Sequence, residues 1–104
     1  MKNFAGKVAV ITGGAGGLGR EFASVAAGLG MKIVLADVQQ DALDRARREL
    51  EGQGAPVLAM VCDVRKGEQV QALADATMLR FGAVHLLFNN AGVGSGGLIW
   101  ESSE

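Results

Sequence analysis

The stretch TGGAGGLG, Thr12–Gly19, decides the fold because of what lies on either side of it. Before it, the apolar run Lys7–Thr12 shows no polar alternation, as expected of a parallel strand buried on both faces. After it, apolar residues recur at helical spacing as far as Gly30, where a left-handed cap would end a helix. The sequence therefore predicts a strand, a glycine turn and a helix over residues 7–30.

Strands and helices continue to alternate along the rest of the chain. Buried strands are predicted at Lys32–Asp37, Val57–Cys62 and Val84–Phe88, with intervening helices that end near Gly52 and Gly82. Because parallel neighbours need long returns that pack on the sheet, this order predicts an α/β, Rossmann-like doubly wound parallel sheet. We expect the first four strands of such a sheet, in the order 3-2-1-4, with three helices, and the last dozen residues as loop.

Length, composition and charge describe one ordinary globular domain. The chain has 104 residues, 49% of them hydrophobic, and ten basic against eleven acidic side chains give a net charge of −1. Without a strong field of either sign, we expect neither a nucleic acid nor a membrane as a partner. The apolar run before the glycines is too short for a signal peptide, and the single cysteine, Cys62, is expected to be a small buried residue. Both features favour the cytoplasm.

Five glycines in the eight residues of the turn leave two alternatives, a phosphate-binding turn or a flexible joint. In a doubly wound fold, the first such turn holds a pyrophosphate against free N–H groups at a helix N-terminus. Glycine permits positive φ there and lets the backbone approach both the phosphates and the strand. The spacing is ambiguous, because three patterns fit: GxGxxG at Gly14, Gly16 and Gly19, TGxxxGxG at Gly13, Gly17 and Gly19, and TGxxGxxG at Gly13, Gly16 and Gly19.

Asp37 ends the second predicted strand, close to the spacing of about 20 residues at which a carboxylate in this fold binds a ribose hydroxyl. A carboxylate accepts hydrogen bonds from the ribose and repels a 2′-phosphate. NAD is therefore favoured over NADP as the cofactor. The alternative is that Asp37 caps the helix that follows it.

Two downstream motifs make the pattern specific. Asp63-Val64 follows the third predicted strand, and Asn89-Asn90-Ala91-Gly92 (NNAG) follows the fourth. Together with a TGxxxGxG turn, they resemble the short-chain dehydrogenase/reductase family. The resemblance covers nearly the whole chain. The sugar-epimerase-like branch shares the TGxxGxxG spacing but usually lacks NNAG, so the shorter-chain branch is favoured.

The resemblance implies a set of cofactor-binding residues along the carboxyl ends of the strands. In this reading the glycine turn holds the diphosphate, Asp37 holds the adenosine ribose, and Asp63 and Val64 contact the adenine. Asn90 and the two residues after it border the cofactor, whereas Asn89 ties neighbouring strands together. The full set is Gly13, Gly14, Ala15, Gly16, Gly17, Leu18, Gly19, Asp37, Asp63, Val64, Asn90, Ala91 and Gly92.

Catalysis in the resembled family is hydride transfer between the nicotinamide and an alcohol or carbonyl carbon, with a tyrosine as general acid/base. A phenol serves when a nearby cation moves its pKa from about 10 toward the working pH. This chain has no tyrosine. We therefore predict no catalytic residue in it, and read it as the N-terminal, cofactor-binding portion of a dehydrogenase. We also predict no metal site. Ser102 and Ser103 are read as caps of a helix that Glu104 begins.

Further predictions concern the fourth strand, the assembly and two single residues. The fourth strand is expected to be an uncovered edge, so the isolated piece should be marginal or self-associating. The full-length protein is expected to be a homo-oligomer. His85 is read as a strand-edge residue and Trp100 as a loop residue. Two other functions stay open: a non-catalytic NAD-binding module, and a methyltransferase-like domain whose acidic strand end binds a different ribose.

Overall fold

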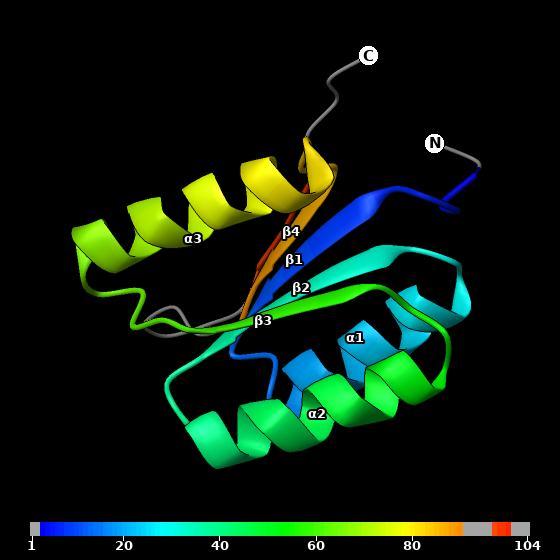
Figure 1. The fold of residues 1–104 in the computed structure, drawn as a ribbon, viewed down its shortest axis with the longest axis horizontal. Helices are drawn as coiled ribbons and strands as arrows, with labels where there is room; N and C mark the ends of the chain where they lie inside the picture. The colour runs from blue at the N-terminus through cyan, green and yellow to red at the C-terminus, as the bar shows by residue number, and fades with distance from the viewer. Residues whose placement is uncertain (1–2, 91–96, 101–104) are drawn as a thin grey trace.

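A computed structural model of the chain describes residues 3–90 and 97–100. Over these ranges the chain forms five strands and three helices (Figure 1). Their order is β1 (Val8–Thr12), α1 (Gly17–Gly28), β2 (Lys32–Asp37), α2 (Gln40–Gly52), β3 (Val57–Val61), α3 (Gly67–Phe81), β4 (Leu86–Asn89) and β5 (Gly97–Trp100). The strands form one sheet in the order β3-β2-β1-β4-β5, in which β1 to β4 are parallel.

The predicted Rossmann-like sheet with the order 3-2-1-4 is confirmed, and its strand bounds differ from the predicted ones by two residues at most. The prediction that the last dozen residues are loop is wrong, because Gly97–Trp100 forms β5, antiparallel to β4. The register places Phe88 opposite Leu98 and Leu86 opposite Trp100. Unpaired N–H and C=O groups at an edge find partners in a returning segment of the same chain. β4 is therefore paired on both sides and is not the uncovered edge that the sequence predicts.

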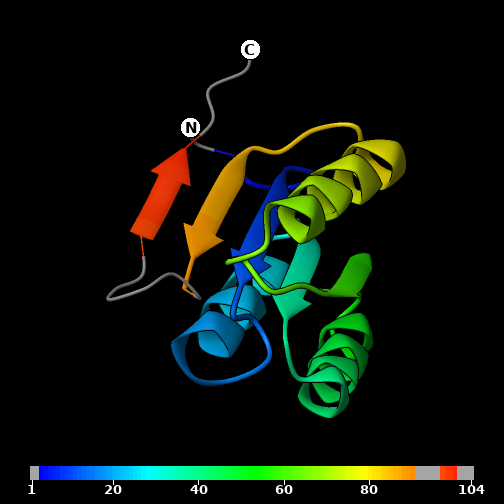
Figure 2. The same ribbon diagram turned by 90° about the vertical axis from the view of Figure 1, so that its left-hand side faces the viewer.

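The sheet lies between two layers of helices, with α1 and α2 on one face and α3 on the other (Figures 1 and 2). All five residues of β1 are buried, which explains its unbroken apolar run. Side chains alternate between faces: Ala9 and Ile11 pack in the cluster with α1 and α2, and Val8 and Val10 pack in the cluster with α3. The doubly covered sheet is the reason why polar alternation is missing from the sequence of the strand.

The helices end close to the glycines at which the sequence predicts their ends. Leu43, Ala46 and Leu50 recur at helical spacing on one face of α2, and this face is buried against the sheet. Glycines with positive φ follow the helices, at +85° for Gly30 and +78° for Gly82. Within the ranges that the structure describes, no helix is both long and apolar enough to cross a bilayer.

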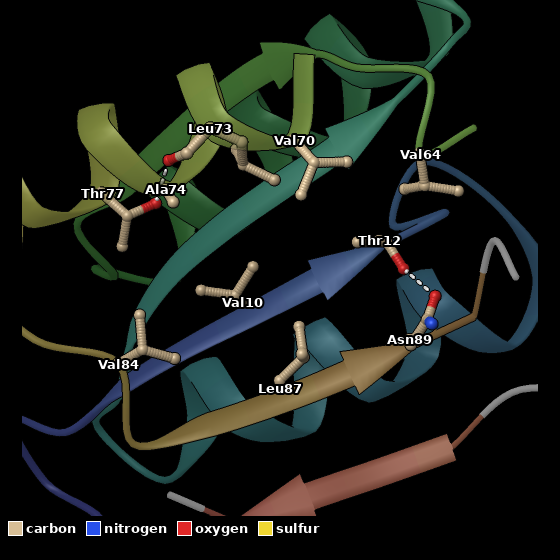
Figure 3. A pocket seen from close by; sticks show the side chains of 10 residues that line it. All are labelled: Val10, Thr12, Val64, Val70, Leu73, Ala74, Thr77, Val84, Leu87 and Asn89. Atoms are coloured by element: carbon tan, nitrogen blue, oxygen red, sulfur yellow. Dashed lines mark hydrogen bonds between the residues drawn. The ribbon is translucent and has the colours of Figure 1, made fainter. Parts of the chain in front are cut away.

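An apolar groove of about 320 Å³ runs along the face of the sheet that α3 covers (Figure 3). Val10 of β1 and Leu87 of β4 form part of its floor, and Val70 and Leu73 of α3 form one wall. At the carboxyl end of the strands, the lining becomes polar with Thr12 and Asn89.

Candidate functional site

The carboxyl ends of the parallel strands bring most of the predicted site residues to one edge of the sheet. Strand ends of a doubly wound sheet are where ligands bind in this architecture. A cavity of about 220 Å³ opens between the loops that follow β1, β2 and β3. Its lining residues are Gly13, Asp37, Val38, Cys62, Asp63, Val64 and Arg65.

The backbone of the turn resolves which glycine triplet is required. Gly13 and Gly17 have φ values of +66° and +57°, in the left-handed region that L side chains rarely adopt. Glycine is required at position 19 for a different reason, because a Cβ there would lie 2.2 Å from the carbonyl oxygen of Gly13. At Gly16 the backbone is extended, and a Cβ would meet no described atom within 4 Å. The sterics therefore match TGxxxGxG and leave the other two patterns without a reason for glycine at position 16.

The other residues of the turn differ in their surroundings. A Cβ on Gly14 would lie 2.7 Å from Cδ2 of Leu35 and 3.1 Å from the carbonyl oxygen of Ile11, so that position is also tight. Ala15 is buried, and Leu18 is exposed. The turn is thus packed against β1 and β2 on one side and open at Gly16 and Leu18 on the other.

The first N–H groups of the turn donate hydrogen bonds to residues of β2. Gly13 and Gly14 both donate to the carbonyl oxygen of Ala36, at 2.7 and 3.2 Å. Ala15 donates to Oδ2 of Asp37, at 3.1 Å. The next N–H groups belong to the first turn of α1, where helix geometry provides no acceptor within the helix. The turn is therefore held by residues 13–15, and the amides available to a ligand are those of the helix N-terminus.

Asp37 lies at the end of β2 with both carboxylate oxygens oriented by backbone amides. Oδ2 accepts from the N–H of Ala15, as described above, and Oδ1 accepts from the N–H of Gln39 at 3.1 Å. The N-cap of α2 is Gln39, without a side-chain cap bond, so the alternative that Asp37 caps this helix is not what the structure has. A carboxylate has about four acceptor sites, so further hydrogen bonds to a ligand remain open.

Asp63 and Val64 follow β3 and line the same cavity as Gly13 and Asp37. Arg65 holds the Asp63 carboxylate through its Nε and Nη2 atoms, each at 3.0 Å. These side-chain hydrogen bonds, and a further one from the backbone N–H of Arg65, lower the pKa of Asp63 to about 2. The carboxylate is therefore ionised at any physiological pH.

A hydrogen-bond network joins the end of β4 to the end of β1. The Thr12 hydroxyl donates to Oδ1 of Asn89 at 2.8 Å (Figure 3) and accepts from the N–H of Asn90 at 3.1 Å. Nδ2 of Asn90 donates to the carbonyl oxygen of Gly13 at 3.4 Å. The expectation that Asn89 ties neighbouring strands is confirmed, and Asn90 lies beside the glycine turn. Ala91 and Gly92 are outside the described residues, as are Ser102, Ser103 and Glu104.

Two single residues behave as the sequence predicts. Cys62 is buried, and burial, together with the charge of Asp63, raises the pKa of its thiol. His85 lies just before β4, where its Nδ1 accepts from the N–H of Val8 at 2.9 Å. Neither arrangement indicates a nucleophile or a general base.

Sequence reasoning missed Arg65 and Thr12 as parts of this edge. Arg65 follows the Asp-Val pair directly, and a basic residue two positions after a strand-end carboxylate is a weak signal. Thr12 opens the quoted turn, but its hydroxyl gains a role only when β4 lies beside β1. The role of Thr12 depends on a contact between strands far apart in the sequence. The role of Arg65 depends on the direction of its side chain, which the sequence does not give.

Comparisons with known proteins agree with this geometry. A sequence model of the family described as short chain dehydrogenase matches residues 7–104. The CLA biosynthesis dehydrogenase/reductase of Lactiplantibacillus plantarum is 41% identical over 101 residues, which are 97% of this chain and 35% of that protein. The 7alpha-hydroxysteroid dehydrogenase of Escherichia coli K12 is 37% identical over 89 residues, which are 86% of this chain and 35% of that protein.

Solved structures show the same likeness. A short chain dehydrogenase/reductase from Burkholderia phymatum, in complex with NAD, superposes with a TM-score of 0.86 at 60% identity, over 99% of this chain and 37% of that one. NAD+-bound xylitol dehydrogenase superposes with a TM-score of 0.84 at 37% identity, over 88% and 35% of the two chains. The chain thus spans little more than a third of the length of these relatives. With its TGxxxGxG turn, its sheet order and these matches, the chain belongs to the short-chain dehydrogenase/reductase family.

Proposed function

We propose that this chain is the N-terminal, dinucleotide-binding portion of an NAD-dependent oxidoreductase, which transfers hydride between NAD(H) and an alcohol or carbonyl substrate. The observation that carries the proposal is the close approach of α1 to the glycine turn at Gly19, where no Cβ fits. This approach places the N-terminus of α1 at the edge where Asp37 ends β2. The Burkholderia phymatum relative, solved in complex with NAD, supports the choice of cofactor class.

The diphosphate would bind at the first turn of α1. That turn has no acidic side chain, and its N-cap, Gly16, carries no side chain that would occupy the amides. N–H groups at a helix N-terminus point outward and carry a partial positive charge, which favours an anion. Gly16, Gly17, Leu18 and Gly19 would therefore contact the diphosphate, while Gly13, Gly14 and Ala15 hold the turn against β2.

The adenosine ribose would bind at Asp37. Its carboxylate is already oriented by two backbone amides, so little entropy is lost when it accepts the ribose hydroxyls. The same negative charge opposes a 2′-phosphate, and Val38, the next residue, offers no cation to offset it. We therefore propose NAD as the preferred cofactor, rather than NADP.

The adenine would enter the cavity between Asp37 and Asp63. Asp63 would accept from the exocyclic amine, and Val64 would contact the ring from the same loop. Toward the nicotinamide end, Asn90, Ala91 and Gly92 would border the cofactor, because Asn90 lies against Gly13 at the start of the turn. The proposed contacts along this edge thus follow the order of the parts of a dinucleotide, from the adenine through the ribose and the diphosphate toward the nicotinamide.

The bound cofactor supplies the carbon that accepts or donates the hydride. The role of this chain is to hold and orient that cofactor, because its 104 residues contain no tyrosine to serve as the acid/base that the family resemblance implies. We place the proton-transfer groups, the substrate pocket and the contacts of a homo-oligomer in the rest of the protein. A cytoplasmic location is part of the same proposal.

Titrating the natural full-length protein with NADH, followed by nicotinamide fluorescence, tests this function. We expect saturable binding, weaker binding of NADPH, no displacement by S-adenosylmethionine, and turnover with a panel of alcohols or ketones. Direct binding of S-adenosylmethionine by a protein without NADH affinity would favour a methyltransferase-like domain. Tight NADH binding without turnover of any substrate would favour a non-catalytic binding module.

A further inference from the structure

Arg65 engages Asp63 more completely than an ordinary surface ion pair does. Its backbone N–H and its Nε both donate to Oδ1 at 3.0 Å, and its Nη2 donates to Oδ2 at 3.0 Å. The Asp63 side chain is 17% exposed, whereas that of Arg65 is 76% exposed. A planar guanidinium that grips a carboxylate through two nitrogens also fixes the plane of that carboxylate.

The hydrogen bonds leave Asp63 with a restricted acceptor capacity. A carboxylate has about four acceptor sites, two on each oxygen. Arg65 fills both sites of Oδ1 and one site of Oδ2, so the open site belongs to Oδ2. The backbone N–H of Asp63 is also held, by Oε1 of Gln69 of α3 at 2.8 Å. Asp63, which lines the cavity, therefore has one open acceptor site, and this site is on Oδ2.

We propose that Arg65 is a positioning residue that fixes Asp63 as a single-site acceptor, so that the cavity selects a purine with an exocyclic amine over one with a carbonyl at that position. This inference rests on the proposed function, in which the cavity receives the base of a dinucleotide. An ionised carboxylate can only accept, so it pairs with the amine of adenine and repels the C6 carbonyl oxygen of hypoxanthine. A protonated carboxyl could donate to that carbonyl, and the guanidinium keeps the proton away.

Other charged groups near Asp63 do not replace this arrangement. Asp37 lines the same cavity, but its oxygens are oriented by the amides of Ala15 and Gln39. Lys66 lowers the pKa of Asp63 through its charge alone, as the last of the contributing causes. Cys62, the other titratable group of the lining, is buried beside the loop. The orientation of Asp63 therefore depends on Arg65.

Paired titrations of the full-length protein with NADH and with reduced nicotinamide hypoxanthine dinucleotide test the inference. The two dinucleotides differ only at one edge of the base, where hypoxanthine has a carbonyl in place of the C6 amine and a proton on N1, so their ratio of Kd values reports how this edge is recognised. We expect the natural protein to bind NADH about tenfold more tightly, as for one hydrogen bond to a charged group. The ratio should fall to roughly two- to threefold in Arg65→Ala, and also in Arg65→Lys, which keeps the charge but lacks the planar fork.

The control is Arg48→Ala, which removes an exposed arginine of α2 that does not line this cavity. Its Kd ratio should match that of the natural protein, and melting curves should show all three variants folded. An unchanged ratio or a larger ratio in Arg65→Ala would overturn the inference. Equal binding of both dinucleotides by the natural protein would overturn the inference and leave the proposed function standing. Binding of neither would overturn both.

Discussion

At both edges of the parallel sheet, side chains form hydrogen bonds with backbone atoms, but these bonds serve different purposes. At the amino edge, where the strands begin, His85 accepts from the N–H of Val8, and Arg80 of α3 donates to the carbonyl oxygen of Val57 at 3.0 Å. At the carboxyl edge, where the strands end, Asp37 and Asn90 also contact backbone atoms. At the amino edge, the side chains satisfy backbone groups of the strands. At the carboxyl edge, they hold a turn beside a cavity.

This difference shows that a polar side chain bonded to the backbone does not by itself mark a site. The Nδ1 atom of His85 is already occupied, because it accepts the hydrogen bond from the N–H of Val8. Asp37 keeps acceptor capacity after its two bonds and faces a cavity beside a helix N-terminus. Substitutions at the carboxyl edge should therefore change ligand binding, and those at the amino edge should change stability alone.

Gly19→Ala should have the largest effect, since it acts on both properties. The new Cβ would overlap the carbonyl oxygen of Gly13, so α1 must move away from the turn. We expect a loss of about 2–4 kcal/mol in the free energy of unfolding. Displacement of the amides should weaken NADH binding by roughly a hundredfold. Urea unfolding and NADH titration of the full-length protein measure the two quantities.

Gly16→Ala provides the matched control at the N-terminus of the same helix. Its Cβ would point into space free of described atoms, and its backbone is extended, so the free energy of unfolding should change by less than about 0.5 kcal/mol. A stable Gly19→Ala variant, or equal losses in both variants, would contradict the steric role assigned to Gly19.

Asp37→Ala should mainly affect binding. It removes the acceptor for the ribose and releases the N–H of Ala15, so NADH affinity should fall about 10- to 100-fold. Without the negative charge, the ratio of NADPH to NADH affinity should rise. Asp37→Asn should lose less NADH affinity, since its amide oxygen can still accept one bond. The control is Asp75→Ala, which removes an exposed carboxylate of α3 and should bind both cofactors with the natural affinity. An unchanged NADH affinity in Asp37→Ala would refute the assignment of Asp37 to the ribose.

His85→Ala probes the other edge. It leaves the N–H of Val8 without its acceptor at the start of β1, which should lower the free energy of unfolding by about 1–2 kcal/mol. His85→Asn should recover part of this loss, because its Oδ1 can occupy nearly the position of Nδ1. In both variants NADH affinity should stay within about twofold of the natural value. A large loss of affinity without a loss of stability would break the proposed division between the edges.

The smallest effect concerns the charge pair of the carboxyl edge. Because the pKa of Asp63 is lowered to about 2 from an ordinary value of 3.8, the stabilisation from its pairing with Arg65 is complete above pH 4 or so and is lost as the pH falls through about 2. Carboxyl-carbon NMR of Asp63 should therefore show no titration between pH 7 and 4. In Arg65→Ala the pKa should return toward 3.8. A natural protein in which Asp63 titrates near 4 would show that the pair does not form in solution.

Much of the fold could be read from the sequence because its signals are local. β2 was predicted with its observed bounds, and the ends of α2 and α3 were predicted from Gly52 and Gly82. β5 was missed because four residues after a glycine-rich stretch of sequence carry little local preference, and they form a strand by pairing with β4. Arg65 was missed for a related reason, since the direction of its side chain depends on where the loop after β3 lies.

By itself, the sequence determined the alternation of strands and helices, the glycine turn between the first two, and a carboxylate at the end of β2. These features depend on residue spacing and on the backbone freedom of glycine, which are properties of short segments. Only the tertiary structure decided which glycines are required, that Asp37 and Ala15 are bonded, and that Asn90 reaches Gly13. Each of these contacts depends on the distance between atoms of two segments that only the folded chain brings together. Such distances are set by tertiary packing rather than by local conformational preference.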